Sequence, residues 1–195
     1  MSATGPRRGV AGSRRSFALS ALTVWALGYV LVGVGLATAA AWPVYEAPRA
    51  LAVGLIGGLL GMTVAVLTRV LRWGMLIGSL AAAGTYLVVS VPLAIPSALS
   101  SIPAFLGGLR DAVLGIALGW KQMLTLNPPL GEYQAVLIPF LVVMLFGTFI
   151  ATLLVLEGGR RATIAVPVVT AMSVFGIAFG AVSYTHLRAH ETKAN

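Results

Sequence analysis

The feature that most constrains this chain is an uncharged run of 25 residues from Phe17 to Ala41. A helix that crosses a bilayer needs about 20 such residues. Similar apolar runs follow at 50–68, 74–95, 135–156 and 162–181. Only 9% of the chain is charged, against about 25% in an ordinary soluble domain, which excludes a soluble enzyme and a disordered tail. We therefore expect an all-α, multi-pass transmembrane helical bundle of about five spans over residues 17–181, the fifth truncated.

One segment, residues 104–124, differs from these spans because it carries Arg110 and Asp111 within an apolar pattern. A charge at the bilayer centre costs about 2.5–3.5 kcal/mol on insertion scales, so a full span is not expected here. The pattern predicts an amphipathic helix that lies on the membrane surface or enters it as a re-entrant segment. Its large apolar residues recur at helical spacing: Phe105, Leu109, Val113, Ile116 and Trp120.

The segments between the spans are short and contain residues suited to the membrane surface. In residues 42–49, Pro43 and Pro48 are expected to end helices, and Trp42 and Tyr45 suit the headgroup layer. The second span is followed by Arg69, Arg72 and the interfacial Trp73. Within that span, glycines four residues apart are spaced to let a neighbouring helix approach closely: Gly54 and Gly58, Gly57 and Gly61.

The basic residues predict the orientation. With the N-terminus in the cytoplasm, the cytoplasmic segments hold eight basic residues and the outer segments three, Arg49, Arg110 and Lys121. This asymmetry favours a plasma-membrane protein with a cytoplasmic N-terminal arm, residues 1–16. The formal charge of +8 therefore requires no nucleic-acid partner, and the expected partner is the lipid bilayer. The eight cytoplasmic residues are Arg7, Arg8, Arg14, Arg15, Arg69, Arg72, Arg160 and Arg161.

The C-terminal residues 182–195 differ in composition from everything before them. They contain both histidines of the chain, His186 and His190. The peptide from Val182 to Thr192 resembles, residue for residue, one reading frame of a transposase-type sequencing adapter. This resemblance implies a non-native tail, a gene cut during library preparation, and a native protein that continues beyond about residue 181. The two histidines beside Glu191 would then not be a metal site.

The remaining sequence contains few residues that could act in catalysis or bind a metal or a cofactor. The absence of cysteine excludes thiol catalysis and disulfides within this chain. No phosphate-binding glycine loop, paired intramembrane carboxylates or metal-ligand cluster appears in residues 1–181. We therefore expect no catalytic residue, no metal site and no cofactor in this chain.

Several short blocks of the sequence occur in a distinctive order. The strongest runs from Gly119 to Gly131 and includes Gly119, Trp120, Lys121, Thr125, Pro129 and Gly131. With seven other blocks, it resembles the N-terminal membrane domain of multi-pass transglutaminase-like proteins common in actinobacteria. The other blocks are Trp42–Tyr45, Pro48–Arg49, Val91–Pro96, Gly108–Asp111, Tyr133–Ala135, Pro139 and Phe175–Gly180.

The resemblance implies a longer parent protein with an extracytoplasmic domain that carries a Cys–His–Asp triad, whose thiolate would attack an amide carbonyl. None of those residues can be placed in this chain, so we expect a membrane-anchoring fragment that is inactive alone. Its partners would be lipid, other membrane helices or the missing C-terminal part. Two alternatives stay open: a small transporter or permease subunit, and a membrane scaffold that positions partners through the Gly119–Gly131 segment.

Overall fold

The computed structural model describes residues 21–125, 130 and 136–191, and their side chains as far as residue 178. Within these ranges the chain forms helices and turns without any strand. This confirms the all-α prediction. The elements are α1 (Ala21–Ala40), α2 (Trp42–Tyr45), α3 (Pro48–Val70), α4 (Met75–Ala94), the 3-10 helix η1 (Pro96–Ser100), α5 (Ile102–Thr125), α6 (Leu137–Glu157) and α7 (Gly159–Glu191).

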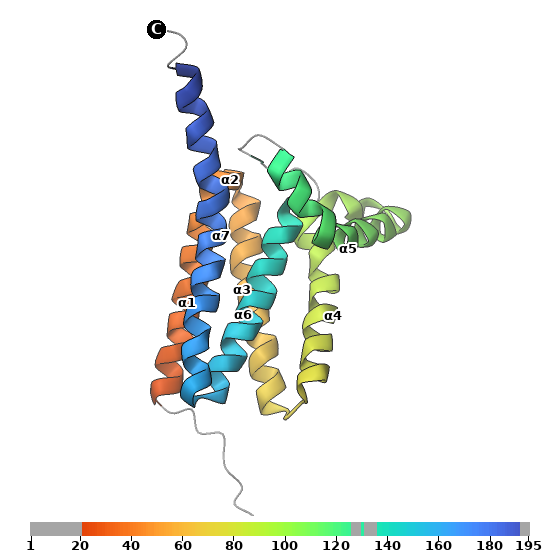
Figure 1. Ribbon diagram of the computed structural model, residues 1–195. Helices are drawn as coiled ribbons and strands as arrows, with labels where there is room; N and C mark the ends of the chain where they lie inside the picture. The colour runs from red at the N-terminus through yellow and green to blue at the C-terminus, as the bar shows by residue number, and fades with distance from the viewer. Residues whose placement is uncertain (1–20, 126–129, 131–135, 192–195) are drawn as a thin grey trace, which may run out of the picture.

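Six helical segments of the described residues are long and apolar enough to cross a membrane. Five of them, those containing α1, α3, α4, α6 and α7, run side by side along one axis, whereas α5 lies across one end (Figure 1). Their outer faces carry exposed large apolar side chains, among them Leu22, Trp25, Leu80 and Val88. Because such faces suit lipid and not water, the chain is a multi-pass membrane bundle.

The bundle has two distinct ends (Figure 1). At the end that we call the basic end, α1 begins, α3 is connected to α4, and α6 is connected to α7. Its name comes from Arg69, Arg72, Arg160 and Arg161. At the opposite end, which we call the closed end, lie α2 and η1, and α5 lies across the ends of α4 and α6.

Glycines let α3 pack closely against two helices. A Cβ atom at Gly58 would stand 2.5 Å from Val34 Cγ1 of α1. A Cβ atom at Gly61 would meet the backbone carbonyl of Leu145 on α6. Neither neighbour leaves room for a side chain, so the predicted close approach of helices along the second span is confirmed, and it involves two partners instead of one.

The most enclosed helix is α6, whose Phe140, Leu141 and Met144 are fully buried. Thr148 and Thr152 are also buried, and their hydroxyls have no hydrogen-bond partner among the described residues. By contrast, the hydroxyls of other helical threonines donate to a carbonyl one turn earlier, as Thr68 does to Val64 at 2.7 Å.

The α5 helix docks on the closed end through small residues that its apolar periodicity did not single out. Its buried side consists of Gly108, Ala112, Gly115, Gly119 and Met123. Of the large apolar residues predicted from the spacing, Val113 and Ile116 lie on a neighbouring side and stay exposed, whereas Leu109 and Trp120 are half-buried against the core. Arg110 and Asp111 are exposed elsewhere on the helix. The helix therefore has three faces, and the smallest side chains contact the bundle because they permit the closest approach.

Residues 42–49 differ from the prediction in two ways. Pro43 and Pro48 begin helices and do not end them, since each lies in the first turn, where proline's missing N–H is not needed. The expectation that Tyr45 lies in the headgroup layer was wrong. Its side chain is fully buried, its hydroxyl donates to the carbonyl of Val136 at 3.3 Å, and its ring lies 5.5 Å from that of Phe140.

The observed bounds of the long helices are close to the predicted spans. The exception is α7, which begins at Gly159 and continues unbroken to Glu191. The predicted fifth span, 162–181, lies within it, and the helix runs on through residues 182–191 of the suspected adapter-derived tail.

Candidate functional site at the basic end

The α3 helix ends in a backbone motif that presents two arginines. The N–H of Trp73 donates to the carbonyl of Thr68 at 2.9 Å, and the N–H of Arg72 donates to that of Arg69 at 3.3 Å. This pairing is a Schellman motif, in which a residue with left-handed backbone, usually glycine, follows the helix. Arg72 occupies that position with φ of 54°. A non-glycine residue there costs about 1–3 kcal/mol, and such strain occurs often at functional positions.

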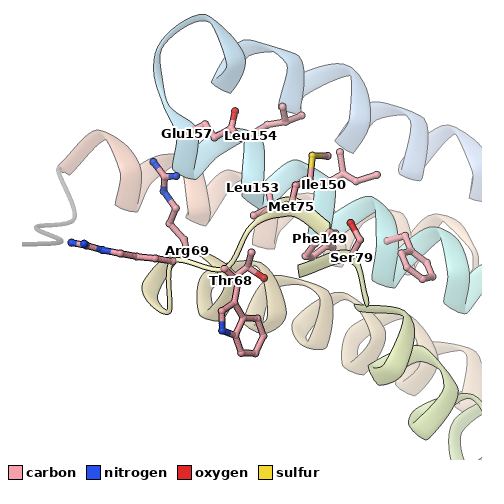
Figure 2. Close-up of a pocket in the computed structure, with 12 residues that line it drawn as sticks. Thr68, Arg69, Met75, Ser79, Phe149, Ile150, Leu153, Leu154 and Glu157 are labelled. Carbon is pink, nitrogen blue, oxygen red and sulfur yellow. The ribbon is translucent and has the colours of Figure 1, made fainter. Parts of the chain in front are cut away.

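A cavity of about 740 Å³ lies beside this turn, between α3, α4 and α6 (Figure 2). Its volume falls within the roughly 300–1,000 Å³ of typical small-molecule sites. The α6 wall is almost wholly apolar and consists of Phe146, Phe149, Ile150, Leu153 and Leu154. The remaining lining residues are Thr68, Arg69, Arg72, Trp73, Met75, Ser79 and Glu157.

The charges around the cavity do not cancel. Glu157, at the end of α6, accepts a hydrogen bond from Arg161 in the following turn, so its carboxylate already has a cationic partner. In the described part of the chain, Arg69 and Arg72 form no ion pair. Arg69 extends from the end of α3 toward the end of α6 that carries Glu157 (Figure 2). The cavity therefore combines an apolar wall with two unneutralised guanidinium groups.

The residues predicted to mark the membrane surfaces fall at both ends. Arg69, Arg72, Arg160 and Arg161 are brought together at the basic end with Trp73. Trp42 in α2 and Trp120 in α5 lie at the closed end. Arg14 and Arg15 lie outside the described residues.

The Gly119–Gly131 block, which carried the family resemblance, is helical in its first part. Gly119, Trp120, Lys121 and Thr125 belong to the last two turns of α5. The Trp120 ring packs edge-on against that of Phe175 in α7 at 5.6 Å, and its Nε1–H donates to the Ile116 carbonyl at 2.8 Å. Thr125 and Lys121 are exposed, whereas Pro129 and Gly131 lie outside the described residues.

The cavity was not predicted from the sequence. Arg69, Arg72 and Trp73 were assigned only to orientation, and nothing in the sequence paired them with the α6 wall. The one available signal was an arginine at the position after a helix where glycine is usual, with a second arginine three residues earlier.

Among the described residues, no group of three or more His, Cys, Asp or Glu side chains could hold a metal ion. No family model, curated protein or solved structure matches the chain.

Proposed function

We propose that this chain is the plasma-membrane anchor of a transglutaminase-like protein, with its N-terminus in the cytoplasm and the catalytic domain carried outside. The resemblance of the Gly119–Gly131 block and the other quoted blocks to that family motivates the assignment. The chain has no cysteine, so it does not supply the thiolate nucleophile of such a triad.

The observation that carries the proposal is the path of α7. This helix starts at the basic end and leads the chain to the closed end (Figure 1). Positively charged connections favour the cytoplasmic side of a membrane. With the basic end in the cytoplasm, α7 would deliver whatever follows it to the outside, the side on which α2 and α5 lie.

The proposal is tested first by sequencing the source DNA downstream of the codons for Phe175 to Gly180. A continuous frame that reaches a domain with Cys, then His, then Asp is the expected result. A stop codon soon after α7 would overturn the anchor proposal. Recovery of the His186 and His190 codons in the source DNA would show that residues 182–195 are native.

The orientation is tested by labelling single thiols on intact cells. The chain has no cysteine, so Gly74→Cys at the basic end and Ser100→Cys at the closed end each introduce one thiol in an exposed position. A membrane-impermeant maleimide should label Ser100→Cys on intact cells and Gly74→Cys only after lysis. The reverse pattern would contradict a cytoplasmic basic end.

The cavity favours a second candidate function, a small transporter or permease subunit. A transporter exposes its binding site alternately to both sides of the membrane. A thiol placed at Ser79, in the cavity lining, should then react with an impermeant reagent applied to either side. Reaction from a single side would count against transport and leave the anchor proposal as it stands.

A further inference from the structure

The cavity at the basic end has the composition of a site for an amphipathic anion. Its α6 wall offers aliphatic and aromatic surface, such as Phe149 and Leu153, to an apolar group. Arg69 and Arg72 offer guanidinium groups that form paired hydrogen bonds with phosphate. The one acid in the lining, Glu157, is paired with Arg161 and does not neutralise them.

The cavity lies where a lipid could enter it from the side. Met75, at the start of α4, is 79% exposed, and Ile150 on the α6 wall is also exposed. Because these apolar side chains belong to membrane-crossing helices, their exposed surfaces face lipid tails. The two arginines and Trp73 are at the end of α3, at the level where headgroups meet the tails.

The backbone at Arg72 adds an independent observation. A glycine at this position would complete the Schellman motif without strain, yet the chain holds an arginine there with φ of 54°. Arg72 is among the residues that line the cavity, so this strained turn lies at the cavity's edge. The arginine at this position therefore does not serve the stability of the turn, and its guanidinium group is available for another role.

We infer that this cavity binds an anionic phospholipid, with the phosphate between Arg69 and Arg72 and an acyl chain along the α6 wall. Basic pockets between membrane helices are suited to such headgroups. The ligand is a lipid and not a free phosphate, because most of the lining is apolar and open to the bilayer. The inference does not depend on the anchor proposal.

The test is native mass spectrometry of the purified full chain, with phosphatidylglycerol or phosphatidylcholine of identical acyl chains added. We expect phosphatidylglycerol to be retained in preference to phosphatidylcholine. Arg72→Gly should weaken phosphatidylglycerol binding about fivefold, and Arg69→Gln with Arg72→Gly about 25-fold, if each cation near the surface contributes as usual. Arg72→Gly also relieves the left-handed strain, so its melting temperature should not fall below that of the parent. Arg72→Asn, which tolerates the same backbone, repeats the test with a second neutral side chain.

The matched control is Arg160→Gln, which removes one positive charge from the same end of the bundle but outside the cavity lining. Its effect should be less than about twofold, because exposed charges away from the site are screened. Equal retention of the two lipids, or an Arg160→Gln effect as large as that of Arg72→Gly, would overturn the inference. Displacement of phosphatidylglycerol by inorganic phosphate alone would assign the site to a soluble anion and would overturn the lipid assignment.

Discussion

The two ends of this bundle are held together in different ways. At the closed end, contacts reach the backbone itself: a Cβ at Gly176 of α7 would stand 2.7 Å from the backbone between Ala40 and Ala41. There the N–H of Leu130 also donates to the carbonyl of Val44 at 2.9 Å. At the basic end, α3, α4 and α6 leave a cavity between them, and the arginines around it are exposed.

Because of this difference, the closed end contributes most to the stability of the bundle, and the basic end leaves space for a ligand. Backbone contacts at the closed end leave no space for a ligand or for a larger side chain, so this end fixes how the helices are arranged. At the basic end, exposed residues such as Gly74 can change with little effect on packing. A binding site is therefore expected at the basic end, and the largest losses of stability are expected from changes at the closed end.

The strongest test of this difference between the two ends is to replace one glycine at each end by leucine. Gly176→Leu should lower the stability of the bundle by about 3 kcal/mol or more, because the backbone of residues 40 and 41 cannot move aside without displacing α1. Gly74→Leu at the basic end should have little effect, since its Cβ would meet open space. Thermal unfolding of the purified variants measures both, and equal losses would show that the two ends do not differ in packing.

A second pair tests the docking of α5. A Cβ at Gly108 would stand 2.5 Å from the Cβ of Ala98 in η1, whereas one at Gly107 would have no neighbour within 4 Å. Gly108→Leu should weaken the docking by about 1–3 kcal/mol and increase hydrogen exchange across α5. Gly107→Leu should leave exchange unchanged or slow it, because leucine favours a helix more than glycine does. Faster exchange in both variants would indicate that α5 docks through another face.

A smaller effect is expected from one hydrogen bond that joins α4 to α5. The hydroxyl of Tyr86 donates to the carbonyl of Ala112 at 2.7 Å. Tyr86→Phe should cost about 1 kcal/mol in thermal or denaturant unfolding. Tyr29→Phe serves as the control, since Tyr29 is exposed on α1. If both variants unfold at the same temperature as the parent, the hydroxyl does not help to hold α5 at the closed end.

The smallest effect is expected at the basic end. Arg161 donates to Glu157 four residues earlier, and both side chains are exposed. Arg161→Gln should leave the melting temperature unchanged, because exposed ion pairs contribute little to stability. A clear loss of stability would mean that the α6–α7 turn, and with it the basic end, is more rigid than its exposure indicates.

Long helices were predictable from the sequence because an apolar run in a bilayer must satisfy its backbone hydrogen bonds internally. The run from 50 to 68 became α3, Pro48–Val70, and the run from 74 to 95 became α4, Met75–Ala94. The helix over 104–124 was also predictable, since its charges and apolar spacing are local properties. The arginines of the candidate site were recognised, but only as markers of orientation.

What only the tertiary structure decided is which side of each helix contacts which neighbour. Lipid and protein interiors are both apolar, so composition does not distinguish a lipid-facing side chain from a buried one. For this reason Tyr45 was placed at the membrane surface although it is buried, and the small residues of α5 were not recognised as its docking face. The cavity arises likewise from the separation of α4 and α6 beside the end of α3, which no local sequence pattern encodes. The sequence by itself determined which segments form the long apolar helices, because that property is local, and the packing of the helices determined where a ligand could bind.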